Sequence, residues 1–123
     1  MKQAILLFFQ IHPLKAKQLN QVCNKLHIRT KVVNPTDYNQ TLGYLAGIQG
    51  FSRGNKPHAP RTVSGEMLLF SGINSELLDR FLSECKASLI PPTPLKAILT
   101  MHNIFWTPEE LYQELSDEHS RMS

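Results

Sequence analysis

The clearest change of hydrophobic pattern in the chain lies between residues 66 and 82, EMLLFSGINSELLDRFL. Four apolar residues in a row, at positions 67–70, predict a strand that is buried on both faces. The turn-forming residues that follow are Ser71, Gly72 and Asn74. Apolar residues then recur at helical spacing, at positions 77, 78, 81 and 82. This stretch therefore predicts a strand that leads directly into a helix.

The start of the chain has the same pattern. Residues 3–11 are apolar at nearly every position and predict another fully buried strand, which His12-Pro13 ends. An apolar stripe with a polar face that includes Lys15 predicts a helix to about residue 27. Residues 28–33 begin by alternating in polarity, which is typical of an edge strand with a partly wet face.

A second helix is predicted after Asn34-Pro35-Thr36, because apolar residues recur at positions 38, 42, 45 and 48. Gly43 and Gly47 would destabilise such a helix by about 1 kcal/mol each relative to alanine. Their presence predicts close packing of another element against this face.

The last third of the chain predicts a fourth strand and a final helix. Prolines at positions 91, 92 and 94 lead into an apolar stretch at 95–100, and 101–105 form a loop. Thr107 is the predicted N-cap, Pro108 suits the first helical position, and Glu110 completes a capping box. The helix that starts here continues toward Met122.

Four strands alternating with four helices predict one three-layer α/β domain over residues 1–123. Buried first and third strands beside a more polar second strand fit the order 2-1-3-4. This is a mainly parallel, minimal Rossmann-like sheet. A ferredoxin-like α+β arrangement is the alternative.

Composition narrows the class of protein further. With 41% hydrophobic and 19% charged residues, the chain is an ordinary globular protein, and it has no apolar run long enough to cross a membrane. Cys23 and Cys85 lie on the apolar stripes of two predicted helices, which favours buried side chains over a disulfide framework. We expect a cytoplasmic protein, whose first residues form a strand rather than a signal peptide.

The net charge of +3 hides a strong asymmetry along the chain. Residues 1–65 carry nine Lys and Arg and one acid, giving a net charge of +8. Residues 66–123 carry four Lys and Arg and nine acids, giving a net charge of −5. The asymmetry indicates either two solvated faces or a surface that binds a partner, in trans or between copies of the chain.

The stretch from Gln49 to Ser64 contains three basic residues and no acid. The three are Arg53, Lys56 and Arg61. A segment this long without helix or strand is either a functional loop or disordered. A functional basic loop would bind a protein partner or an anionic small molecule. Weak nucleic-acid binding by the basic half is an alternative.

Ligands of open parallel sheets bind beyond the carboxyl ends of the strands, where the strand order reverses. In the predicted sheet this point lies between the first and third strands. The candidate binding residues there are His12, Ser71, Gly72, Asn74, Thr100, His102 and Asn103. Asn74 is equally well explained as a helix N-cap.

No catalytic set, metal site or cofactor motif is predicted, because no histidine has ligand spacing and no nucleophile elbow surrounds Ser71. The sequence therefore favours a binding or regulatory module. The alternative is a small-molecule enzyme that uses His12 or His102 as acid or base, with Ser71, Asn74 and Asn103 holding an anion.

Several short motifs resemble a family of short bacterial proteins filed as a domain of unknown function. They are EML-F-SG at 66–72, LKA-LT at 95–100, the loop from Asn103 to Trp106, the EL--EH ending at 114–119, and LGYLAG at 42–47. The resemblance covers nearly the whole chain and implies a loose association with amino-acid metabolism. It implies no catalytic residues.

Overall fold

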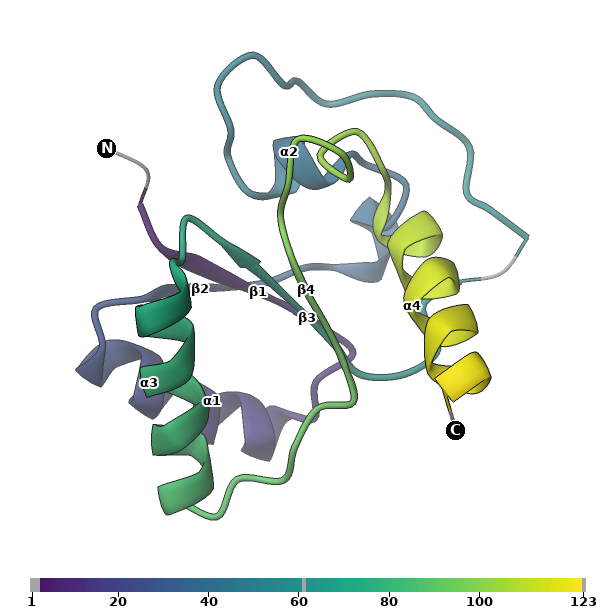
Figure 1. The fold of residues 1–123 in the computed structure, drawn as a ribbon. Coiled ribbons are helices and arrows are strands. Elements are labelled where there is room, and N and C mark those ends of the chain that lie inside the picture. Colours follow the sequence, from purple (N-terminus) through teal and green to yellow (C-terminus); the bar gives the residue numbers. More distant parts are fainter. Residues whose placement is uncertain (1–2, 61, 123) are drawn as a thin grey trace.

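The computed structural model describes residues 3–60 and 62–122, and its centre is a four-stranded sheet with helices on both faces (Figure 1). The strands are β1 (Ile5–Phe9), β2 (Arg29–Val32), β3 (Met67–Ser71) and β4 (Leu95–Ile98), in the order β2-β1-β3-β4. The β1–β2 and β3–β4 pairs are parallel, which confirms the predicted order and the mainly parallel sheet. The inner strands, β1 and β3, run antiparallel, so their carboxyl ends lie at opposite ends of the sheet, whereas the site predicted between them needs both at the same end.

Two helix layers cover the sheet (Figure 1). The helices α1 (Pro13–Lys25) and α3 (Ser75–Ala87) pack on one face. The other face holds the 3₁₀ helix η1 (Pro35–Asp37), α2 (Leu42–Leu45) and α4 (Pro108–Met122). Four α-helices were predicted, and the described residues form four. The capping box that starts α4 is confirmed by reciprocal bonds between Thr107 and Glu110, of 2.9 and 3.2 Å.

The second helix is much shorter than its hydrophobic pattern predicts. Only four residues form α2, and η1 accounts for three more. Gly43 lies directly against the Phe51 ring, since a Cβ atom there would come within 2.8 Å of the ring. Gly47 has a φ of +75° and turns the chain away from the helix. The close packing predicted for Gly43 is confirmed, whereas Gly47 serves to end the helix.

The two inner strands form the core of the protein. All five residues of β1 and all five of β3 are buried. Alternate side chains face opposite layers, so Leu6 and Phe8 pack under α1 and α3, while Leu7 and Phe9 pack on the other face. Fully burying one such side chain stabilises the fold by about 1.5–3 kcal/mol.

The two halves of the chain repeat the same arrangement. Each has a strand, a 13-residue helix, a second strand and a further helix. The first strand and helix recur after 62 residues, since β1 and β3 start at 5 and 67, and α1 and α3 start at 13 and 75. Positive φ angles recur at the same interval, at Gln10 and Gly72 and again at His27 and Leu89.

An approximate two-fold axis relates these halves. Leu7 and Leu69 are equivalent residues, and they face each other at the middle of the antiparallel β1–β3 pair. The interval increases to 66 after residues 91–94, because β2 and β4 start at 29 and 95. The N-caps Thr41 and Thr107 are then also equivalent. Residues 91–94 are therefore an insertion in the second half.

Ion pairs link the basic first half to the acidic second half. Lys15 pairs with Glu66 at 3.0 Å and also donates to the Pro92 carbonyl at 3.3 Å. Lys15 is buried, although the helical pattern had placed it on the polar face of α1. Lys25 pairs with Glu84, again at 3.0 Å. Part of the charge asymmetry along the sequence is thus neutralised within the molecule.

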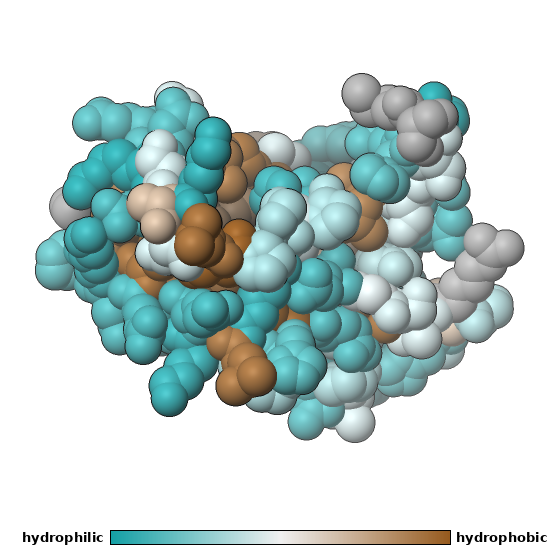
Figure 2. Space-filling view, turned by 90° about the horizontal axis from the view of Figure 1, so that it is seen from below, coloured by the Kyte–Doolittle hydropathy of each residue, from teal (hydrophilic) through white to brown (hydrophobic). Residues whose placement is uncertain are grey.

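The α1–α3 layer also contains both cysteines. Cys23 is buried and Cys85 half-buried, and both are free thiols. Burial raises the pKa of Cys23 to about 12, with a smaller contribution from the nearby Cys85, so its thiol is inert. Figure 2 shows this side of the molecule, where apolar side chains reach the surface between hydrophilic ones. Within residues 3–60 and 62–122, no helix has the length and apolar character needed to span a membrane.

Candidate anion-binding site

The antiparallel centre separates the residues predicted to form one site. His12 follows β1, and the end of β1 lies beside the start of β3, where Phe9 pairs with Met67. Ser71 lies at the other end of β3 and pairs with Ile5. His12 is therefore at one edge of the sheet, and Ser71, Gly72 and Asn74 are at the opposite edge. Thr100, His102 and Asn103 share that opposite edge, because β4 runs parallel to β3.

Most of these side chains have local structural partners. Asn74 caps α3 by accepting from the Leu77 N–H at 2.8 Å. Asn103 is buried and closes its own loop, accepting from the Thr100 N–H and donating to the Ile98 carbonyl. The Thr100 hydroxyl accepts from two backbone N–H groups of the same loop. A binding role for these residues stays a prediction, and the contacts explain them as caps and turn residues.

The remaining two histidines of the predicted site are exposed. The His12 Nδ1 accepts from the Leu14 N–H at 3.2 Å and so caps α1. The His102 ring packs edge-on against Trp106, with 5.2 Å between the ring centroids. Of the two histidines considered for an enzyme site, His12 therefore lies at the opposite end of the sheet from Ser71, whereas His102 follows β4 at the same end as Ser71.

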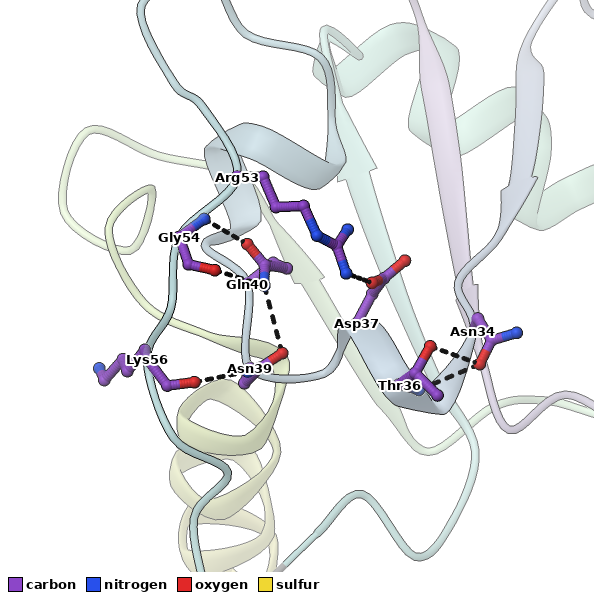
Figure 3. Close-up of polar contacts among 8 residues, drawn as sticks. All are labelled: Asn34, Thr36, Asp37, Asn39, Gln40, Arg53, Gly54 and Lys56. Carbon is purple, nitrogen blue, oxygen red and sulfur yellow. Dashed lines mark hydrogen bonds and ion pairs between the residues drawn. The ribbon is translucent and has the colours of Figure 1, made fainter.

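The long basic loop is tied to its neighbours (Figure 3). Arg53 pairs with Asp37 at 2.8 Å, and the Gln40 side chain both accepts from the Gly54 N–H and donates to its carbonyl. Asn39 donates to the Lys56 carbonyl, while the Lys56 ammonium group pairs with Glu110 at 3.0 Å. Two of the three predicted cations are thus occupied within the chain, and Arg61 lies outside the described residues.

A buried carboxylate holds the far end of this loop. The Glu109 side chain, at the start of α4, is only 2% exposed. Its Oε1 accepts from the Ala59 N–H at 2.9 Å, and its Oε2 lies 3.0 Å from His58 Nδ1. These two contacts fix the loop onto α4, and no sequence pattern indicated them.

A cavity of about 600 Å³ opens beside the end of α2, next to the start of β1, along β2 and at the end of β3. We call it the β2 cavity. Its lining residues are Gln3, Ile5, Arg29, Lys31, Leu45, Ala46, Gly47, Ile48, Gln49 and Ser71. Arg29 and Lys31 face into it because they pair with Ile5 and Leu7, whose side chains point to the same face of the sheet. Of the predicted site residues, Ser71 alone lines this cavity.

The β2 cavity is basic. Arg29 donates to the Gln3 side chain at 3.0 Å, and Lys31 donates to the Leu45 carbonyl at 2.9 Å. Among residues 3–60 and 62–122, no carboxylate forms an ion pair with either cation. Ser71 is largely buried but lines the cavity, and no hydrogen bond joins its hydroxyl to another described residue. Two cations and one hydroxyl donor therefore remain available to an anionic group.

The cavity exists because α2 is short. In the second half, the positions equivalent to Arg29 and Lys31 are Leu95 and Ala97, which lie under α4. Tyr112 and Leu115 of α4 pack into that apolar cluster. The first half has only four residues of helix at the equivalent place, so its sheet surface stays open. Arg29 and Lys31 were missed as site residues, although their alternation on a partly wet strand was the available signal.

The molecule is therefore an α/β protein built from two equivalent halves, one of which carries an open basic cavity. Residues 66–122 match the family described as Domain of unknown function (DUF3783). This match confirms the resemblance to a family of unknown function for the second half, from the residue before β3 to the end of α4, whereas the LGYLAG motif at 42–47 lies outside the matched residues. Neither a curated protein nor a solved structure matches the chain.

Proposed function

We propose that the protein is a cytoplasmic binding module that recognises anionic groups in the β2 cavity. The observation that carries the proposal is the pair of cations, Arg29 and Lys31, which line one cavity without a carboxylate partner among the described residues. The volume of about 600 Å³ falls within the roughly 300–1,000 Å³ that is usual for ligand sites.

The chemistry of the lining favours a carboxylate or phosphate group. A guanidinium group binds either group through paired N–H donors, and a lysine adds a mobile positive charge. The Ser71 hydroxyl, at the end of β3, supplies a neutral donor on the other side of the cavity. A hydrogen bond to a charged group contributes about 1.5–3 kcal/mol, so loss of both cations would weaken binding by at least about tenfold.

Inorganic phosphate and succinate are suitable first probes. Isotope-labelled protein would be titrated with each, following the backbone amide resonances of residues 29–32 and of Ser71. We expect saturable shifts at these amides in the natural protein. The double variant Arg29→Gln/Lys31→Gln should need at least about tenfold more anion to give the same shifts.

The matched control removes the same charge from the other face of the sheet. Lys17 and Lys86 are exposed on α1 and α3, so Lys17→Gln/Lys86→Gln lowers the net charge by the same amount. We expect this variant to bind as the natural protein does. Equal weakening in both double variants would show a response to net charge alone and would contradict the proposal.

A further inference from the structure

We infer that the natural ligand of the β2 cavity is an acidic amphipathic α-helix of another protein, which covers the first half as α4 covers the second. This inference rests on the proposed function, and it specifies the partner of the same site. It follows from the two-fold relation between the halves, because equivalent surfaces of the sheet are covered in one half and open in the other.

The covered half shows what such a helix does. In α4, Tyr112 and Leu115 pack against the sheet beside Leu95 and Ala97. Tyr112 also lies over Gly65, since a Cβ atom on that glycine would come within 2.9 Å of the tyrosine hydroxyl. A helix thus buries the sheet at this position through side chains three residues apart.

The first half, whose sheet surface is open, lacks side chains equivalent to Tyr112 and Leu115. The residue equivalent to Tyr112 is Ala46, which follows α2 directly, and Gly47 then turns the chain away. Because α4 has 15 residues and α2 has 4, the first half is short of 11 residues of helix. At about 1.5 Å per residue this corresponds to roughly 16 Å of helix. A partner helix of about three turns would therefore supply the length of helix that the first half lacks.

Charge identifies the kind of helix. Arg29 and Lys31 stand where the second half has Leu95 and Ala97, so a purely apolar helix would leave two cations buried and unpaired. Ile5 and Leu45 provide an apolar floor beside them. The partner helix should therefore carry an aromatic or leucine side chain for this floor and carboxylates for the two cations.

A peptide of residues 107–122 of this chain is a suitable probe, since it holds its own capping box, Tyr112, Leu115 and several acids. Its binding would be measured by fluorescence anisotropy after labelling with fluorescein. We expect saturable binding that is at least about tenfold tighter than that of a scrambled peptide of the same composition. Arg29→Gln/Lys31→Gln should weaken it by about tenfold or more.

A second variant tests the geometry without changing charge. Ala46→Tyr places at position 46 the side chain that its equivalent, Tyr112, has in the second half. We expect this ring to occupy the cavity and to prevent peptide binding. Binding of the peptide to Ala46→Tyr with unchanged affinity would overturn the inference, because the helix would then lie elsewhere.

The outcomes separate this inference from the function on which it rests. Phosphate binding that depends on Arg29 and Lys31, together with equal binding of the ordered and scrambled peptides, would overturn the helix and leave an anion site for a small ligand. Failure of both phosphate and peptide to bind would overturn both proposals. If sedimentation shows a dimer that Arg29→Gln/Lys31→Gln abolishes, the occupant of the β2 cavity is a second copy of this chain. That result would overturn the inference that the helix belongs to another protein.

Discussion

The two halves of this protein share one backbone plan and differ in their outer layer. Each half places a 13-residue helix on the same face of the sheet, with matching left-handed residues before and after it. On the other face, α4 spans 15 residues and α2 only four. The sheet beneath α4 is apolar, whereas the sheet beside α2 carries Arg29 and Lys31.

Helix length and strand polarity therefore change together between the two halves. A strand under a complete helix must be apolar, because burying unpaired charge is costly. Where the helix stops early, the strand can carry cations, and a cavity remains. The cavity is therefore a consequence of how the first half departs from the second.

The largest expected effect tests whether the halves share one core. Leu7 and Leu69 are both fully buried and face each other across the two-fold axis. We expect Leu7→Ala and Leu69→Ala each to lower the free energy of unfolding by about 2–5 kcal/mol. Urea denaturation would measure this, with Leu82→Ala on the exposed side of α3 as a milder control. A small loss at one of the two leucines would show that the halves are not equivalent at their centre.

The next largest expected effect is on the long basic loop, residues 49–64, which has no equivalent in the second half. Glu109→Gln replaces the carboxylate that holds Ala59 and His58 with an amide that cannot accept at both positions. We expect a loss of about 1–3 kcal/mol in unfolding free energy. Hydrogen exchange at the Ala59 amide should also become faster. Glu114→Gln, at an exposed position of the same helix, is the control and should leave that exchange unchanged.

Replacing the equivalent N-cap residues, Thr41 and Thr107, would measure how much each cap stabilises its outer helix, α2 or α4. Thr107→Ala should lower the unfolding free energy by about 0.5–2 kcal/mol, since it breaks the capping box of a long helix. Thr41→Ala should cost less, because the first N–H groups of α2 also donate to the Trp106 and Ile104 carbonyls. Thermal or urea unfolding would rank the two, and a larger loss at Thr41 would contradict this account.

The smallest expected effect is on how the free energy of unfolding depends on pH. Burial tends to raise the pKa of Glu110, but the Thr107 N–H and Lys56 outweigh it and hold that pKa below the ordinary value of 4.5. A lowered folded-state pKa stabilises the protein above that ordinary value, and this contribution is lost as the pH falls through the folded-state pKa. The group is half exposed, so Glu110→Gln should cost under about 1 kcal/mol at pH 7.

Urea denaturation of natural protein and Glu110→Gln at a series of pH values would measure this dependence. We expect the difference between them to shrink as the solution is made more acidic than pH 4.5. Glu118→Gln, on the exposed part of α4, provides the comparison for general charge effects. A difference that stays constant down to acid pH would contradict the role given to the carboxylate.

Much of the fold could be predicted from sequence because its signals are local. The apolar runs at 3–11 and 67–70 gave the inner strands, and the residues around Thr107 gave the start of α4. Strand direction could not be predicted, since a strand buried on both faces has the same pattern in either direction. That direction decides whether His12 and Ser71 share an edge of the sheet.

The candidate site was harder to predict because it depends on contacts between distant residues. The apolar spacing from Tyr38 to Ile48 indicated a complete helix, which would have covered the first half. The packing of Phe51 on Gly43 and the bonds from Gln40 to Gly54 instead accompany a short α2. Only this shortening exposes Arg29 and Lys31 in a cavity. Ser71 was predicted for a different reason, its position at the end of a buried strand.

The antiparallel centre has a further consequence for folding kinetics. Paired residues are 24 positions apart in β1–β2 and 28 in β3–β4, but 58 to 66 apart in β1–β3. Closing a shorter loop of chain costs less conformational entropy. Each half can therefore form its own strand–helix–strand unit before the two halves pair. The last step then resembles association of two partners, and the tether between α2 and β3 sets their effective concentration.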